Sequence, residues 1–526
     1  MRNSSPEPGN SGAILKRAWA HAYGLYFEHS FPSTRQGNGR LSLDALNFMT
    51  TRKSLFFSFL DRYSGLVITV VSSMAIARLL TPAEIGVYSV TMVLMMFAST
   101  VRDLGAGQYL VQEKDLTIER IRAVWTVQLG LGLGLALLVV LASFPVASFY
   151  NEPRMRDIMF VVALNYAINP FGSLTHAWLM REMRFDSTAV IRFAGGLSGA
   201  LASTWLAWKN YGPISLALGL LVSTMVGAVF SIHFRPKFFP WIPGVREIKR
   251  VLQFGGQLTA SSIVGVFSSG SPELLIGKLQ NLTAAGLYSR SSGLVMMFHR
   301  LIVDAVGAVC LPWFASLSRE RSDLAAPFVK ATAYVTALGW SFCIVVVCLA
   351  HPIIRALYGT QWDQSVDLVR LLAVAAAFSV PAALCPAVLL SSGGVAVISR
   401  VTVLGAIQTI LLVSVGAALS LNAVGIALIV SALVNSLLWQ RATARHIGLT
   451  AGILLRSMRQ SALVAALSGL GPLLSLWIYG PYTDLMVMPL LVGTTGCFIG
   501  FVAGVALFRH PLSEELQRVK KNILKL

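Results

Sequence analysis

Long apolar segments recur along almost the whole chain. A helix needs about 20 predominantly apolar residues to cross the hydrocarbon core of a bilayer. Fourteen such segments follow one another between residues 54 and 508, without the short alternating pattern typical of an outer-membrane barrel. Their centres lie near Val70, Leu94, Leu135, Leu164, Gly199, Leu220, Val264, Leu294, Thr336, Ala377, Gly405, Leu428, Leu467 and Gly496. We therefore predict an all-α polytopic membrane protein with about 14 transmembrane helices.

Short polar breaks separate several of these segments. Pro, Gly and Asn cluster where a chain turns tightly between two helices. Such clusters occur at Thr81-Pro82, Asn151-Glu152-Pro153, Asn210-Tyr211-Gly212-Pro213, Asn281-Leu282-Thr283 and Tyr479-Gly480-Pro481. We expect a helix to end and another to begin at each of them.

The chain also contains an internal repeat. Seven of the 21 residues from 76 to 96 are identical to those 200 positions later, including Gly86 with Gly286 and Tyr88 with Tyr288. Apolar composition alone would give about two identities. Because six spans separate the copies, both copies run the same way across the bilayer, as in transporters with a pseudo-twofold axis along the membrane normal. This predicts two six-helix lobes around a central cavity, with two extra C-terminal helices.

These patterns divide the chain into five parts. We expect a partly disordered cytoplasmic tail without a signal peptide, an N-lobe, a C-lobe, the two extra helices and a basic cytoplasmic C-tail. Their predicted ranges are 1–53, 54–245, 246–455, 456–508 and 509–526. Met49 is an alternative translation start just before the first span.

Composition excludes a water-soluble enzyme. Of the 526 residues, 55% are hydrophobic and only 12% are charged, with a mean hydropathy of +0.68. Soluble domains have about 25% charged residues. A chain with half that fraction cannot coat a soluble surface of this size.

The formal net charge of +19 is distributed as a membrane protein requires. If the N-terminal tail lies inside, 32 of the 42 Lys and Arg residues fall in the inside segments. Cytoplasmic loops carry such an excess of Lys and Arg. The charge therefore predicts cytoplasmic termini and an even number of spans. It is spread over eight separate segments, and this argues against nucleic-acid binding, which needs a contiguous basic face.

The cysteines suggest neither a disulfide framework nor a metal site. All five lie in apolar stretches, without a C-x-x-C pair or a His at ligand spacing. Buried free Cys behaves as a small apolar residue. We predict no metal and no organic cofactor.

Ionisable residues inside the spans are the most informative positions, because each costs about 2.5–3.5 kcal/mol at the bilayer centre. They include Asp61, Arg62, Arg102, Arg192, Glu273, Arg290, Arg300 and Asp304. Under a structural interpretation, Arg62 pairs with Asp61 and Arg300 with Asp304, whereas Arg102 and Arg192 lie near helix ends and extend to water.

Under a functional interpretation, the same residues form a binding site. Arg62, Arg290 and Arg300 lie on the first and eighth spans, where helices of the two lobes could meet, with Arg192 as a further candidate. Arginines that face one cavity suit a phosphate-bearing substrate, because a guanidinium binds phosphate bidentately and stays charged.

Glu273 is the strongest candidate for ion coupling. It directly follows Pro272, which removes a backbone donor, so we expect the helix to break there. Broken helices mark ion and substrate sites in transporters. We expect Glu273, with Asp61 and Asp304 as further candidates, to bind H⁺ or Na⁺ or to pair with an arginine.

The first repeat copy carries a family signature. The segment Ala77–Tyr88 (ARLLTPAEIGVY) resembles the sequence that joins the first two helices in bacterial oligosaccharide flippases. Its second copy, Ala284–Ser289, lacks the acidic residue. Together with the fourteen spans and the six-plus-six repeat, it resembles the polysaccharide transporter family of the multidrug/oligosaccharidyl-lipid/polysaccharide exporter superfamily, over roughly residues 50–510.

The resemblance implies a function. Such a flippase would move an undecaprenyl-diphosphate-linked oligosaccharide repeat unit across the bacterial inner membrane by alternating access, for lipopolysaccharide, exopolysaccharide or capsule biosynthesis. Arg62 and Arg290 would contact the diphosphate, with Arg300 behind them. The lipid tail would stay among membrane lipids, and a polysaccharide polymerase and the chain-length machinery would be partners.

Two other functions fit the sequence less well. A cation-coupled multidrug antiporter of the same superfamily needs an acidic cavity, whereas Arg outnumbers acids within these spans. Membrane polymerases and ligases resemble one another in carrying a long periplasmic loop. The longest outside connection here, from His351 to Asp367, has only 17 residues. The sugar, the polymer, the ion and the oligomeric state stay open.

Overall fold

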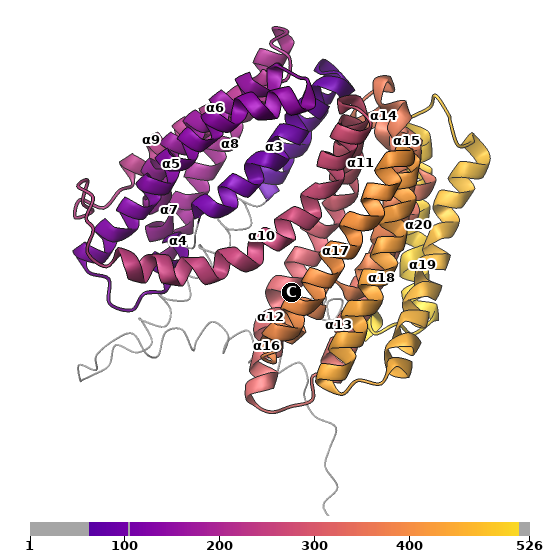
Figure 1. Cartoon of the computed structure of the whole chain (residues 1–526). Helices are drawn as coiled ribbons and strands as arrows, with labels where there is room; N and C mark the ends of the chain where they lie inside the picture. Colours follow the sequence, from indigo (N-terminus) through magenta and orange to yellow (C-terminus); the bar gives the residue numbers. More distant parts are fainter. Residues whose placement is uncertain (1–62, 104–105, 515–526) are drawn as a thin grey trace, which may run out of the picture.

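The computed structural model describes residues 63–103 and 106–514, and these form helices joined by short turns (Figure 1). The helices of the first half are Tyr63–Leu79, α3 (Pro82–Asp103), α4 (Ala106–Gln112), α5 (Ile118–Tyr150), α6 (Arg154–Ile168), α7 (Pro170–Arg181), α8 (Phe185–Trp208) and α9 (Ile214–His233).

The second half begins with a long helix, α10 (Ile248–Leu279). It continues with α11 (Leu282–Phe298), the π-helical turn η1 (His299–Val303), α12 (Asp304–Arg319), α13 (Ala325–Cys348), α14 (Ala350–Leu357), the 3₁₀ turn η2 (Thr360–Ser365), α15 (Val366–Ser379), the 3₁₀ turn η3 (Val380–Ala382), α16 (Cys385–Ser391), α17 (Val395–Leu419), α18 (Leu421–Ile447), α19 (Ala451–Tyr479) and α20 (Val487–Leu507).

Each of the fourteen predicted centres lies in a helix of this structure. Among the described residues, nine helices are long and apolar enough to cross a membrane, or ten if α6 and α7, which meet at a 50° bend, form one span. A helical, multi-pass membrane protein is therefore confirmed. The number fourteen stays a prediction.

Helices end and begin at the predicted breaks. Asn151 and Asn210 adopt left-handed backbone conformations (φ 53° and 62°) after α5 and α8, and Gly480 (φ 80°) ends α19. Asn tolerates this conformation better than most residues, and Gly adopts it without steric cost.

The signature segment forms a capping box at the start of α3. The Thr81 backbone N–H donates to the Glu84 carboxylate (2.8 Å), and the Glu84 N–H donates to the Thr81 hydroxyl (3.3 Å). This exchange satisfies N–H groups that a helix start otherwise leaves unpaired. At the second copy, the Asn281 side chain accepts from the N–H of Ala284 and caps α11 alone. Asn281 explains why this copy tolerates Ala284 in place of the acid.

The two repeat copies contact each other through their glycines. A Cβ on Gly86 of α3 would lie 1.7 Å from the carbonyl oxygen of Leu282, and one on Gly286 of α11 would lie 1.9 Å from that of Pro82. Leu282 is the residue 200 positions after Pro82. The contacts are therefore reciprocal, and only glycine fits at this helix crossing.

Two groups of helices meet at this crossing. In Figure 1, the helices α3–α9 lie on the left and α11–α20 on the right, and the groups converge at the end where α3 begins. Helix α10 runs from beneath the first group to the second. An outer stripe on α5, formed by Leu133, Leu137 and Leu141, is more than half exposed, as expected of side chains that face lipid.

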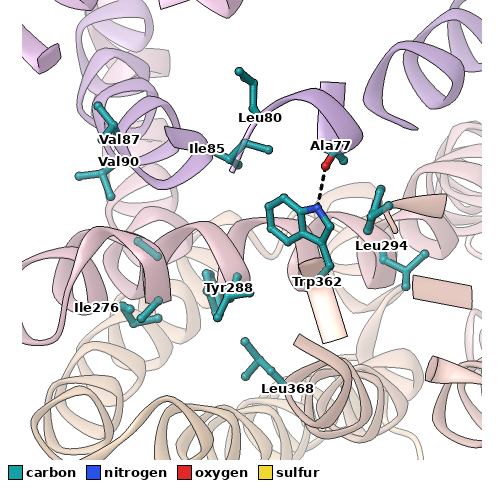
Figure 2. Packing of buried hydrophobic residues seen from close by; sticks show 14 of the residues in the cluster. Ala77, Leu80, Ile85, Val87, Val90, Ile276, Tyr288, Leu294, Trp362 and Leu368 are labelled. Atoms are coloured by element: carbon teal, nitrogen blue, oxygen red, sulfur yellow. Dashed lines mark hydrogen bonds between the residues drawn. The ribbon is translucent and has the colours of Figure 1, made fainter. Parts of the chain in front are cut away.

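The largest apolar core lies where the groups converge. It joins residues of Tyr63–Leu79, α3, α6, α10, α11 and α15 around Trp362, which is fully buried (Figure 2). The indole Nε1 of Trp362 donates to the Ala77 carbonyl at 2.7 Å. A buried Trp normally satisfies its N–H in this way.

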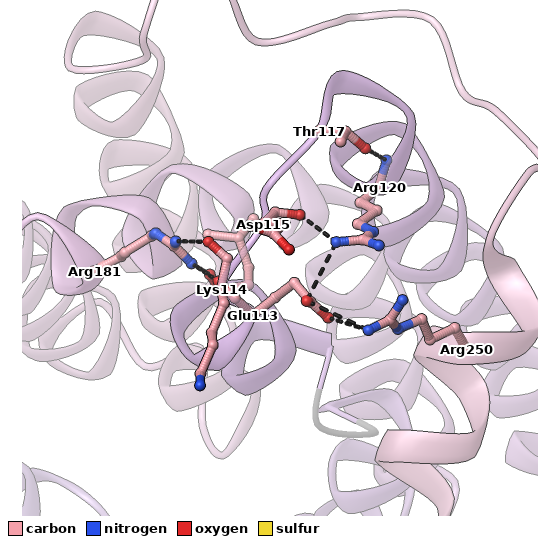
Figure 3. Close-up of polar contacts among 8 residues, drawn as sticks. Glu113, Lys114, Asp115, Thr117, Arg120, Arg181 and Arg250 are labelled. Atoms are coloured by element: carbon pink, nitrogen blue, oxygen red, sulfur yellow. Dashed lines mark hydrogen bonds and ion pairs between the residues drawn. The ribbon is translucent and has the colours of Figure 1, made fainter. Parts of the chain in front are cut away.

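A polar network fixes the start of α10 to the first half (Figure 3). The Glu113 carboxylate lies 3.3 Å from Arg120 Nη1 and 3.4 Å from Arg250 Nη2 of α10, and Arg181 Nη1 donates to the Glu113 carbonyl (2.6 Å). The Tyr109 hydroxyl and the two guanidiniums hold the pKa of the Glu113 carboxyl below its usual range.

Helices α19 and α20 pack on α13 through small residues. A Cβ on Gly471 would lie 2.3 Å from the backbone of Gly496. The Thr336 hydroxyl of α13 donates to Ser461 Oγ (2.9 Å), which lies 3.2 Å from Nε2 of the fully buried His510. Hydroxyl pairs and close backbone approach are the usual means of helix association in membranes.

The glycine crossing leads to a prediction about stability. Gly86→Ala should destabilise the folded protein by about 1–3 kcal/mol, because the added methyl group meets backbone that cannot yield. The thermal midpoint of the detergent-purified protein would measure this loss.

Gly130→Ala is the matched control. Gly130 is a mid-helix glycine of α5 with open space where its Cβ would lie. Its replacement should leave stability unchanged or raise it, because Ala favours helix. Equal midpoints for the two variants would contradict the close contact.

Candidate functional site

A cavity of about 760 Å³ lies between the two groups of helices. Its walls come from helix Tyr63–Leu79, α3, α6 and α9 on one side and from α10, α11, η1 and the end of α14 on the other. Four charged residues line it: Arg102, Glu273, Arg290 and Arg300. The cavity thus gathers side chains that are distant in the sequence.

Arg290 joins the two sides of this cavity. Its Nη1 donates to the Ser73 hydroxyl of helix Tyr63–Leu79 at 2.8 Å, whereas its Nε is buried and has no hydrogen-bond partner in the described part of the chain. The guanidinium carbon lies 5.8 Å from the ring centre of Tyr358 and 6.0 Å from that of Trp362, at the outer limit of cation–π attraction.

No carboxylate neutralises Arg290 among the described residues, since none of their ion pairs includes it. A positive charge with only neutral partners in an apolar surrounding attracts a mobile anion. The site is therefore suited to a phosphate group.

Glu273 lines the same cavity, but the expected break in its helix is wrong. Helix α10 continues through Pro272 as far as Leu279. Pro272 cannot donate to the carbonyl of Ser268, one turn before it. The hydroxyl of Ser271 donates to that carbonyl instead, at 3.0 Å. This substitute hydrogen bond removes the reason for the helix to open, and the Glu273 carboxyl faces the Ser289 hydroxyl of α11.

Arg300 and Arg102 occupy other parts of the cavity wall. Arg300 lies in the π-helical turn η1, and Arg102 lies in the last turn of α3, with its guanidinium carbon 5.3 Å from the ring centre of Tyr166. The sequence predicted Arg300 at the site but assigned Arg102 to a water-exposed helix end. Arg102 lies 14 residues after Tyr88, close to four helical turns. This spacing could have placed Arg102 and Tyr88 on one face of α3.

The structure does not bring the remaining candidates to this cavity. Arg192 is exposed on α8 and lies outside the lining, as an arginine near a helix end that extends to water does. Asp304 is also exposed, and its carboxylate lies 3.7 Å from Nε2 of His299. Asp61 and Arg62 lie outside the described residues.

The arrangement offers no evident metal site. Within residues 63–103 and 106–514, no group of three or more His, Cys, Asp or Glu side chains could hold a metal ion. The expectation that the protein needs no cofactor stays a prediction.

A comparison with known families shows to which family this chain belongs. Residues 75–367, more than half of the chain, match the family described as "Polysaccharide biosynthesis protein". The chain belongs to this family. The resemblance inferred from the segment Ala77–Tyr88 is thereby confirmed.

Curated relatives are 21% and 24% identical to the chain over the regions that align. The "Succinoglycan biosynthesis transport protein ExoT" of Rhizobium meliloti (strain 1021) is 24% identical over 342 residues, which are 64% of this chain and 68% of that protein. The "Lipopolysaccharide biosynthesis protein WzxC" of Escherichia coli (strain K12) is 21% identical over 57% of this chain and 61% of its own length. The first of these names describes a transport protein, and both place their proteins in polysaccharide or lipopolysaccharide biosynthesis.

Solved structures show the same fold. The lipid II flippase MurJ, in an inward closed conformation, superposes with a TM-score of 0.71 at 12% identity, over 87% of this chain and 99% of that one. An inward-facing multidrug resistance MATE family transporter of the MOP superfamily gives a TM-score of 0.59 at 13% identity, over 73% and 95%. This chain therefore has a MurJ/MATE-like fold.

Proposed function

We propose that the protein is a flippase that carries an undecaprenyl-diphosphate-linked oligosaccharide repeat unit across the bacterial inner membrane, for the biosynthesis of a surface polysaccharide. The observation that carries this proposal is the cavity between the two helix groups, with Arg290 lacking a carboxylate partner among the described residues. The family and the transporter names of its relatives support the polysaccharide class.

The cavity supplies what a charged head group needs. A diphosphate cannot enter about 30 Å of hydrocarbon without groups that replace its hydration. Arg290 comes from α11, Arg300 from the following turn η1, and Arg102 from α3. In this proposal the guanidiniums bind the diphosphate, Arg62 adds a further contact, and the lipid tail stays among the membrane lipids.

The two halves act as alternating lobes in this mechanism. The lobes are residues 54–245 and 246–455, each with six of the fourteen helices, related by a pseudo-twofold axis at the crossing of Gly86 and Gly286. Residues 456–508 form the extra pair, which supports the second lobe. In this mechanism both ends of the chain, the tail 1–53 and the basic tail 509–526, lie in the cytoplasm.

Hydrogen bonds across the lobes close the cavity at the end where α3 begins. Trp362 and Gln361 donate to the Ala77 carbonyl of helix Tyr63–Leu79, Gln361 also reaches Leu80 (3.3 Å), and Arg78 donates to the Ala356 carbonyl (2.8 Å). Carbonyls at a helix C-terminus lack partners within their own helix. This outer closure, which holds those carbonyls, must open to release the substrate outside.

Glu273 is proposed as the coupling group. Its carboxyl lies in the cavity with the arginines, so entry of H⁺ or Na⁺ would change the charge that the substrate meets. A polysaccharide polymerase and the chain-length machinery are the partners that would receive the exported unit.

Arg290→Ala should abolish polymer export while the amount of membrane protein stays unchanged, because the diphosphate loses its main cation. Arg290→Lys should retain part of the export, since Lys keeps the charge without the bidentate geometry. Polymer released by a deletion strain that expresses each variant is the measurement.

Arg456→Ala provides the control, because Arg456 is exposed on α19 and does not line the cavity. Normal export by Arg290→Ala would contradict the proposal. Drug hypersensitivity of the deletion strain with normal polymer would instead indicate the antiporter.

Glu273→Gln should make export insensitive to ionophores that collapse the H⁺ or Na⁺ gradient, and should slow it, because the amide cannot exchange an ion. The measurement compares export by wild type and variant with and without each ionophore. Wild-type export that is indifferent to both gradients would remove the coupling role and leave the flippase proposal intact.

Trp362→Phe should favour opening of the outer closure about fivefold, because it removes one hydrogen bond worth about 1 kcal/mol. The readout is the rate at which an impermeant thiol reagent labels Ser89→Cys from the outside, since Ser89 lines the cavity near this end.

The matched control is Trp340→Phe, which removes an equivalent hydrogen bond to the Ala377 carbonyl (2.8 Å) within the second half alone. It should leave the labelling rate unchanged. Equal rates for all three proteins would show that Trp362 does not hold the closure.

A further inference from the structure

The part of the first-half wall that α6 and α9 form is polar but uncharged in the described lining, whereas α3 contributes Arg102. Helix α6 contributes Asn165, the junction between α6 and α7 contributes Asn169, and α9 contributes Thr224. Within the described lining, no residue from these two helices is charged, whereas η1, α10 and α11 contribute Arg300, Glu273 and Arg290. The two walls therefore present different chemistry to one ligand.

We propose that this α6–α9 wall is a sugar-binding subsite, in which Asn165 and Thr224 bind hydroxyl groups of the oligosaccharide next to the diphosphate. The inference rests on the proposed function and extends it to the part of the substrate that varies between polymers. Asn165 is its specificity-determining residue.

The geometry of Asn165 carries the inference. The residue is only 6% exposed, and its Nδ2 donates to Thr224 Oγ1 at 2.8 Å, which orients the amide. Its Oδ1 accepts no hydrogen bond from the described residues and faces the cavity that Asn165 lines. A nearly buried amide whose acceptor is directed into a cavity needs a donor from a ligand or from water.

The backbone presents this wall as one surface. Val162, Asn165 and Tyr166 recur at helical spacing on one face of α6, and Asn169 follows at the next such position, directly after the helix. The 50° bend between α6 and α7 follows at once, and a Cβ on Gly132 of α5 would lie 2.7 Å from Pro170 at this bend. Close packing of α5 behind the bend fixes the position of the two amides.

Neutral amides and hydroxyls suit sugar hydroxyls for a simple reason. A sugar hydroxyl both donates and accepts, as Asn and Thr side chains together do. A carboxylate or guanidinium offers only one of the two functions. Because a buried site that hydrogen-bonds a hydroxyl rejects a ligand lacking it, this wall can select the glycosylated lipid over its sugar-free precursor.

Binding of two lipids to the purified full-length protein tests the subsite. The probes are undecaprenyl diphosphate, which has no sugar, and the lipid-linked oligosaccharide purified from the deletion strain, where it accumulates. Asn165→Leu should weaken binding of the lipid-linked oligosaccharide about tenfold and leave undecaprenyl diphosphate unchanged. Arg290→Ala should weaken binding of both.

Two further variants make the result decisive. Thr224→Val has nearly the same volume and should weaken only the glycosylated ligand, even if Asn165→Leu folds poorly. Asn435→Leu is the matched control, because Asn435 donates to Thr409 Oγ1 (3.2 Å) between α18 and α17 and does not line the cavity. It should change neither affinity.

The outcomes separate the two proposals. Equal effects of Asn165→Leu and Thr224→Val on both lipids, or no effect on either lipid, would overturn the subsite and leave the flippase intact. Wild-type protein that binds neither lipid would overturn the proposed function and the subsite with it.

Discussion

Arg290, whose guanidinium forms no ion pair with a carboxylate of residues 63–103 or 106–514, constrains the rest of this structure. Inserting a charged residue at the bilayer centre costs about 2.5–3.5 kcal/mol. Arg290 meets this cost with the Ser73 hydroxyl, two aromatic rings and a cavity, but with no carboxylate among the described residues. The cavity must therefore hold water or an anion. Because Ser73 and Arg290 lie on different halves, the same contact makes the cavity shared.

The close contact between α3 and α11 lies at one end of this shared cavity. At the crossing of Gly86 and Gly286, backbone meets backbone, so the contact tolerates rotation better than interlocked side chains would. The outer closure above it consists of side-chain donors on helix-end carbonyls. Such bonds are worth about 1 kcal/mol each, since water can replace them when the end opens.

Local and periodic features of this fold could be predicted from the sequence, whereas the facing of single side chains could not. The turns at Asn151 and Gly480 depend on local backbone chemistry, and the structure confirms them. The glycines Gly86 and Gly286, which the repeat pairs, make reciprocal contacts, whereas the two-lobe arrangement stays a prediction. The break at Pro272 was wrong because a neighbouring hydroxyl, Ser271, compensates for the missing donor. A proline in a membrane helix thus indicates a break only if no nearby Ser or Thr satisfies the freed carbonyl.

The site followed the same division. Arg290 and Arg300 could be found because a charge within an apolar span is a strong signal by itself. Asn165 carries no such signal, since a polar amide in a membrane helix commonly serves helix packing, as Asn435 does. Whether an arginine lies on the outer surface, like Arg192, or lines a cavity, like Arg102, depends on which neighbours cover the helix. The neighbours of a helix are set by the tertiary structure, so the local sequence does not reveal them.

The repeat itself explains how one fold acquires an asymmetric cavity. The residues 200 positions before Glu273 and Arg290 are Ser73 and Val90, so both charges arise only in the second copy. Positions that hold the halves together, such as Gly86 and Gly286, are retained in both copies. A strictly symmetric cavity would offer a diphosphate and a neutral sugar the same two walls. With Glu273 and Arg290 on the second copy and the neutral α6–α9 wall on the first, the cavity instead favours one orientation of a two-part ligand. In the proposed flippase, this would present the head group in the same way at every cycle.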